Sequence, residues 1–220
     1  MAVIHQTTMN PGKLDLLSAW LPDQPWYLGA GRRQELTRAG GFRLDDPAGE
    51  VGIEFMVVAD GASVFYQVPM TYRGEPLPGA AGAGLIGTSE HGVLGTRWIY
   101  DGVHDPVLVA QLIACVQGDA QPQAQSVSDT PDPTVTVHPV AGGRLTVTGS
   151  AVAANGPSGT DLRVATAGEP GQLILRLHRI LLPDGTGTGD EPGHPCLSAT
   201  WRHPDGTRPR GVFVSALFAG

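Results

Sequence analysis

The chain has 220 residues, of which 41% are hydrophobic, so it is long and apolar enough to bury a substantial core. Its 21 acidic residues outnumber its 14 basic ones, which gives a formal charge of −7. Acidic and basic residues are both scattered along the chain and form no long run. This distribution excludes a basic stripe that could follow phosphates, so we expect no nucleic-acid partner. The 31 glycines and 19 prolines predict many turns and short strands.

The N-terminus and the cysteines indicate where the protein works. Residues Met1 to Met9 lack the basic start and apolar run of a secretory signal, and no apolar stretch approaches the roughly 20 residues that span a bilayer. Cys115 and Cys196 form neither a disulfide framework nor a CxxC pair, which favours buried, reduced thiols. We therefore expect a soluble, cytoplasmic protein with no membrane partner.

The first predicted elements are a short strand over residues 2–8 and a small amphipathic helix. Asn10-Pro11 has the pattern of an N-cap followed by proline at the first helical position. Leu14, Leu17 and Leu21 then fall three and four residues apart, and Pro22 ends the run. One apolar face on so short a helix predicts a sheet on which it lies.

An antiparallel sheet is predicted downstream of this helix. Residues 51–57 alternate apolar and other positions, Asp60-Gly61 is a turn signal, and residues 64–72 read as the return strand. Pro69 within that strand indicates an edge or a bulge. A glycine-rich loop and two more strands follow, at residues 74–84, 85–88 and 93–100.

A second helix and a change of composition come next. Asp105-Pro106 repeats the cap-plus-proline pattern, and an apolar helix is predicted to run to Gly118. Polar residues 119–134 read as a linker or surface excursion, and β signals follow at 135–140, 144–152, 162–165, 173–182, 197–202 and 211–218. We predict an α+β fold, mostly antiparallel β, divided as 1–118, 119–134 and 135–220. We expect the two halves to fold as one interdependent unit.

Three motifs contain residue types that could carry chemistry, but none predicts a catalytic residue, a metal or a cofactor. The stretch QPWYLGAGRR, residues 24–33, lacks both the lysine and hydroxyl of a phosphate-binding loop and the strand and helix of a dinucleotide fingerprint. The other two match no specific ligand pattern: Glu90, His91, Asp101, His104 and Asp105, and the set His194, Cys196 and His203, which lacks a fourth ligand.

The order of these elements resembles the N-terminal cap domain of maltokinases. The resemblance rests on Trp26, Tyr27, Gly29, Gly31 and Arg32 in the glycine turn, followed by antiparallel strands and the helix entered at Asp105-Pro106. It covers about residues 1–118, and YQVPMTYRG and EHGVLGTRWIYD are similar to free-standing actinobacterial cap-like proteins. Ala30 stands where the family commonly has lysine. The resemblance implies a curved antiparallel sheet with two short packed helices, followed here by an all-β C-terminal half.

Two functions are left open by this resemblance. A kinase core would need a catalytic loop, a metal-binding aspartate and a phosphate-directed lysine, and no such set is recognisable. We therefore expect a non-catalytic cap-like protein that binds a sugar kinase or another protein of carbohydrate metabolism. The alternative is a protein that binds a sugar or sugar phosphate, or an enzyme, with a cleft between its halves. Its polar wall would consist of Glu90, His91, Arg97 and His104.

Overall fold

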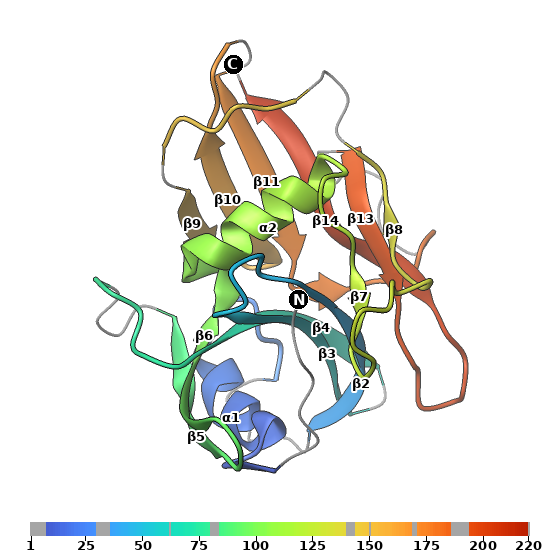
Figure 1. Ribbon diagram of the computed structural model, residues 1–220. Coiled ribbons are helices and arrows are strands. Elements are labelled where there is room, and N and C mark those ends of the chain that lie inside the picture. The colour runs from blue at the N-terminus through green and yellow to red at the C-terminus, as the bar shows by residue number, and fades with distance from the viewer. Residues whose placement is uncertain are drawn as a thin grey trace.

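The part of the chain that the structure describes folds into two antiparallel sheets and two short α-helices (Figure 1). The structure, a computed structural model, describes residues 8–29, 36–61, 63–79, 84–139, 144–149, 151–168, 171–185 and 194–219. The mostly antiparallel α+β fold predicted from the sequence is confirmed, and the described residues after 134 form strands and loops only.

The first sheet has the strand order β1-β5-β6-β4-β3-β2-β7, with β12 beside β4. Its strands are β1 (Met9–Asn10), β2 (Leu36–Leu44), β3 (Gly52–Asp60), β4 (Val64–Arg73), β5 (Leu85–His91), β6 (Gly95–Asp101), β7 (Gln123–Ala124) and β12 (Ile180–Leu181). The β3–β4 hairpin forms where the turn signal predicts it. Pro69 lies on β4 between the residues that pair with β6 and those that pair with β12, where its missing N–H disrupts no ladder.

The second sheet has the strand order β8-β13-β14-β11-β10-β9. Its strands are β8 (Thr136–Val137), β9 (Val152–Asn155), β10 (Gly159–Ala165), β11 (Gln172–His178), β13 (His194–Thr200) and β14 (Arg210–Ala219). In β11, Leu173, Leu175 and Leu177 are buried while the residues between them are partly exposed, as the alternation predicts.

Helix α1 (Lys13–Trp20) begins later than predicted. Its N-cap is Gly12, whose backbone N–H donates to the Asp15 carboxylate at 3.1 Å, and the 3₁₀ turn η1 (Leu21–Asp23) follows it. Asn10 instead belongs to β1 and pairs with Glu90, so Asn10-Pro11 cannot cap the helix. Most of the strand predicted for residues 2–8 lies outside the described residues.

Helix α2 (Pro106–Val116) begins as predicted. The Val107 N–H donates to Oδ1 of the capping residue Asp105 at 2.9 Å, and Pro106 is the first helical residue. The 3₁₀ turn η2 (Gly102–His104) leads into it. Neither helix in the described part of the chain is both long and apolar enough to cross a bilayer.

Strand β2 was not predicted, because Gly40-Gly41 reads as a loop signal. Both glycines have positive φ, 150° and 130°, next to a bulge at Ala39. A side chain at Gly41 would place its Cβ 2.0 Å from the carbonyl oxygen of Phe55. Glycine is therefore needed for this strand to approach β3 so closely.

Two predicted strands of the second half are corrected. The run 173–182 is divided between β11 in the second sheet and β12 in the first, with Arg179 between them. The run 144–152 forms only an isolated bridge from Val147 to Thr166 within residues 144–149. Residues 146–149 are exposed, so pairing there would bury little apolar surface.

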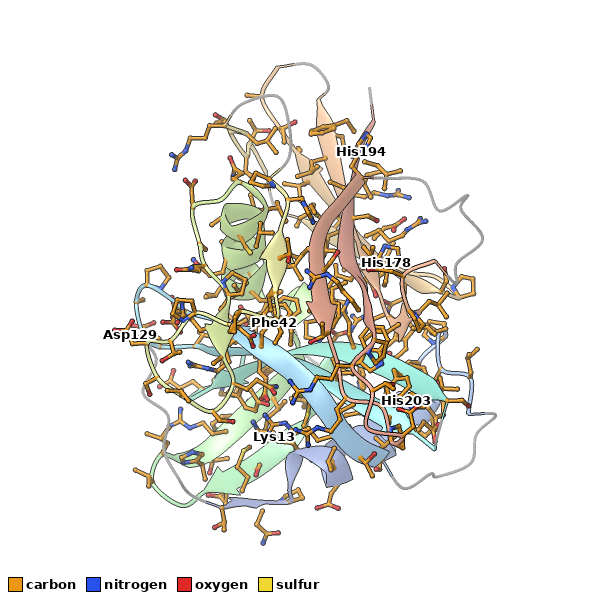
Figure 2. All side chains as sticks on the ribbon, turned by 90° about the vertical axis from the view of Figure 1, so that its right-hand side faces the viewer. Lys13, Phe42, Asp129, His178, His194 and His203 are labelled. Atoms are coloured by element: carbon orange, nitrogen blue, oxygen red, sulfur yellow. The ribbon has the colours of Figure 1, made fainter. Side chains whose placement is uncertain are left out.

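The core has two parts, one on each face of the first sheet. In β3, Met56 and Val58 face the cluster under α1, while Phe55 and Val57 face a larger cluster shared with α2 and the second sheet. Figure 1 shows α1 on one side of the first sheet, with α2 and the second sheet on the other. Figure 2 shows Phe42 at the junction of the two sheets, where its ring stacks on Phe55 and lies 5.9 Å from Phe213. That segments 1–118 and 135–220 fold as one interdependent unit stays a prediction.

Candidate functional site

The glycine-turn stretch begins with a completely buried tryptophan. Trp26 packs in the cluster under α1 with Leu17 and Leu21, its ring centroid 5.8 Å from that of Trp20 and 5.9 Å from that of Tyr66. Trp26 therefore points inward, beneath α1. Burial of so large a ring makes it an anchor for the chain that leaves α1.

Two hydrogen bonds hold the next residues against the hairpin. The Tyr27 hydroxyl donates to Oδ2 of Asp60 at 2.8 Å, and the Leu28 N–H donates to the Tyr66 hydroxyl at 2.9 Å. Burial is the main cause that raises the pKa of Tyr27 well above its usual value, and the hydrogen bond to Asp60 raises it further. A Cβ at Gly29 would lie 2.2 Å from the Tyr27 ring, so a larger residue there would displace that ring. Gly31 and Arg32 lie outside the described residues.

The sequence reasoning missed Arg179, which joins the second half to this corner. Its Nη2 lies 2.6 Å and 2.8 Å from the carboxylate oxygens of Asp101, its Nε donates to the Thr160 hydroxyl at 2.8 Å, and its Cζ lies 5.0 Å from the Trp26 ring centroid. Arg179 and Asp101 are both completely buried. The only signal in the sequence was a polar interruption in the apolar run 173–182. We call Trp26, Tyr27, Asp101 and Arg179 the signature corner.

A buried amide also ties the two sheets together. Gln67 of β4 donates through Nε2 to the carbonyl oxygens of Phe213 at 2.6 Å and His178 at 3.1 Å. Its backbone N–H donates to the carbonyl oxygen of Arg179 at 3.0 Å. Strand β4 is thus bonded to the second half at several points along its edge.

Three of the four predicted polar-wall residues lie together on the β5–β6 hairpin. Glu90 accepts a hydrogen bond from the Thr96 hydroxyl at 2.7 Å, and Nδ1 of His91 accepts from the Leu94 N–H at 3.1 Å. The Arg97 guanidinium donates to the Leu94 carbonyl. These bonds fix the hairpin turn. His104 lies apart from them, at the end of η2.

His104 lines an open cleft of about 760 Å³ between α2 and the second sheet. The other lining residues are almost all apolar: Val103, Pro106, Val109, Ala110, Ile113, Val147, Gly149, Ala151, Ala153 and Val164. A single imidazole on an apolar wall offers no paired acid and base. This cleft favours an apolar occupant.

A buried carboxylate occupies the first sheet beside α1. Glu54 lies 2.6 Å from Nζ of Lys13, accepts from the Tyr72 hydroxyl at 2.6 Å and accepts from the Gln125 amide at 2.9 Å. Burial acts to raise the pKa of Glu54, but the ammonium of Lys13 and the hydrogen bond from Tyr72 outweigh it, so the pKa is lowered. The only lysine of the chain is thereby committed to an internal ion pair.

Neither proposed ligand set comes together as a metal site. Within the described ranges, no group of three or more histidine, cysteine, aspartate or glutamate side chains is placed to hold an ion. Asp105 caps α2 and pairs with Arg73 at 2.6 Å, while Asp101 pairs with Arg179. Figure 2 shows His194 and His203 far apart along the second sheet, with His178 between them.

Comparison with known families agrees with this geometry. Residues 20–105 match the model of the maltokinase N-terminal cap domain. The match begins at Trp20, includes the signature-corner residues Trp26, Tyr27 and Asp101, and ends at Asp105 where α2 is capped. It stops before β12 and the second sheet. The resemblance read from the sequence is thus confirmed over residues 20–105, where the chain is similar to the maltokinase N-terminal cap domain.

Proposed function

We propose that this chain is a non-catalytic, cytoplasmic cap-like module that binds a kinase of carbohydrate metabolism. The observation that carries the proposal is the match of residues 20–105 to a domain that belongs to maltokinases. The free thiols of Cys115 and Cys196, both buried and both with a pKa raised to about 12 by burial, support a reducing compartment.

The non-catalytic part of this proposal is supported by the pairing of three buried carboxylates with basic side chains. Glu54 is paired with Lys13, Asp105 with Arg73 and Asp101 with Arg179. A general acid, base or metal ligand must present free lone pairs or protons to a cleft. These carboxylates instead present theirs to neighbouring side chains.

The β5–β6 hairpin is the surface we assign to the partner. At its turn, Val93 is 61% exposed and Leu94 is 44% exposed. Glu90 lies at the end of β5 that enters this turn and is also exposed. Apolar side chains within a polar rim are typical of a protein interface. The second sheet covers the opposite face of the first sheet and leaves this hairpin open.

The test mixes the full chain with a maltokinase from which its own cap has been removed. We expect a 1:1 complex by size-exclusion chromatography with light scattering, and no complex with the intact kinase. Val93→Asp should abolish the complex without changing the melting temperature. Val127→Asp, at a residue 54% exposed in segment 119–134, is the matched control and should leave the complex intact.

Two results would overturn the proposal. One is the absence of a complex with the cap-less kinase. The other is sugar-dependent ADP release by the purified chain alone, with ATP and magnesium.

The alternative function, small-molecule binding between the halves, is favoured by one observation, the 760 Å³ cleft beneath α2. A volume in this range accommodates a small ligand. Its apolar wall fits a hydrophobic compound better than a sugar. Binding of a fluorescent apolar probe that is lost in Ala110→Trp would support it.

A further inference from the structure

A second cleft has a wall of a different character. It measures about 380 Å³ and lies where the first sheet, segment 119–134 and the second sheet meet. Its lining consists of Arg38, Ala39, Gly40, Gly41, Gln125, Ser126, Asp132, Thr134, Thr200, Trp201, Arg202 and Arg208. We call it the junction cleft. Three arginines against one aspartate give it a positive charge in a chain whose net charge is −7.

The β2 bulge brings two of these arginines to the same place. The bulge falls between Arg38 and Gly40, and the carbonyl oxygen of Ala39 accepts a hydrogen bond from the backbone N–H of Arg202 at 2.7 Å. This bond joins β2 to the residue just beyond the end of β13. The missing side chain at Gly41 lets Gln125 approach β2, so segment 119–134 closes the third side.

The arginines of the junction cleft differ from most others in the chain. Arg43, Arg73, Arg144, Arg176 and Arg179 each form an ion pair with an aspartate. Among the described residues, the side chains of Arg202 and Arg208 form no hydrogen bond or ion pair, and that of Arg38 donates only to the Gln125 amide oxygen. Their guanidinium groups therefore keep free donors on an open cleft.

The acidic group in this wall, Asp132, forms no ion pair with the three arginines in the described part of the chain. Oδ1 of Asp132 accepts from the backbone N–H of Thr134 at 2.8 Å and from its hydroxyl at 2.6 Å. The lining side chains carry a net charge of about +2, which balances the charge of about −2 on a phosphate group near neutral pH. Guanidinium groups bind phosphate oxygens in bidentate geometry.

The remaining wall is polar and suits a hydroxylated ligand body. Ser126 and Thr200 also line the cleft, and their hydroxyls form no hydrogen bond within the described ranges. The volume lies at the lower end of the range for small-molecule sites. We propose that the junction cleft binds a small phosphorylated polyol or sugar, whose phosphate is held by Arg38, Arg202 and Arg208. The site is separate from the β5–β6 hairpin and does not depend on a kinase partner.

The test is isothermal titration of the full chain with glucose 6-phosphate as the probe. We expect saturable binding at least tenfold tighter than that of glucose, and tighter than that of inorganic phosphate. R202Q and R208Q should each weaken it at least fivefold, and the double variant should abolish it. R163Q removes an exposed arginine of β10 and is the matched control, with unchanged affinity.

Several results would overturn the proposal. Unchanged affinity in the double variant would show that the anion binds elsewhere. Equal affinity for glucose and glucose 6-phosphate would show that the phosphate is not recognised. Tighter binding of citrate than of glucose 6-phosphate would assign the cleft to carboxylates. Because the titration contains no kinase, its failure leaves the proposed partner binding standing. Thermal melts of all variants verify that each is folded.

Discussion

The signature corner and the junction cleft both lie where the two halves meet, but they use arginine in opposite ways. At the signature corner, Arg179 is buried and both carboxylate oxygens of Asp101 are hydrogen-bonded to it. At the junction cleft, Arg202 and Arg208 are exposed and have no acidic partner among the described residues. A buried charge must be paired to be tolerated, whereas an exposed one is free to meet a ligand. We therefore expect the first set to control stability and the second to control binding.

The largest effect is expected for Arg179→Ala. It would leave Asp101 buried without its partner, at a cost of about 3–5 kcal/mol in the free energy of unfolding. Urea denaturation at neutral pH measures this loss. In Arg179→Met with Asp101→Leu, an apolar pair replaces the ions, and part of the stability should return. A loss below about 1 kcal/mol for Arg179→Ala would show that the signature corner contributes little to the stability of the fold.

Trp26→Ala should cost about 3 kcal/mol or more, because it leaves a cavity under α1. The control is Leu28→Ala, whose side chain is 58% exposed and whose loss should change the free energy of unfolding by less than about 0.5 kcal/mol. Thermal melts compare the two variants. If Trp26→Ala melts like the wild type, the glycine-turn stretch is not a structural anchor.

Glu54→Gln should show a pH-dependent effect. Since the pKa of Glu54 is lower in the folded chain than its ordinary value of 4.5, its contribution is complete above that value and is lost as the pH falls through the folded-state pKa. At neutral pH the substitution should cost about 1–3 kcal/mol. Below about pH 4.5 the difference from wild type should shrink. Glu50→Gln, at an exposed carboxylate, should show no such convergence in denaturation curves recorded across this range.

The smallest effect on stability is expected at the junction cleft. Arg202→Gln and Arg208→Gln should each change the free energy of unfolding by less than about 0.5 kcal/mol, because neither side chain has a partner to lose. Chemical denaturation without ligand tests this. A loss comparable to that of Arg179→Ala would show that these arginines hold the fold.

Much of the first half could be predicted from local sequence signals. The cap at Asp105 and the β3–β4 turn depend on neighbouring residues, so propensity and periodicity reveal them. Strand β2 could not be predicted, because its glycines serve a close approach to β3 that appears only once the sheet is formed. Local preference was overridden there by tertiary packing.

The contacts between the halves could not be read from the sequence at all. Arg179 lies 78 residues from Asp101, and nothing in its own alternating run indicates a buried partner. The junction cleft likewise collects Arg38 and Arg208 from opposite ends of the chain. The polar wall expected from Glu90, His91, Arg97 and His104 was based on closeness in sequence, and the structure places His104 apart from the other three.

The interdependence of the halves is tested most directly by a thermal melt of residues 1–118 expressed alone, beside the full chain. This fragment would lack Arg179 and β12, and the apolar face around Phe42 and Phe55 would lose the second sheet that covers it. We predict that the fragment shows no cooperative transition, because it leaves Asp101 unpaired and that face in water. A fragment that melts cooperatively at the temperature of the full chain would contradict this.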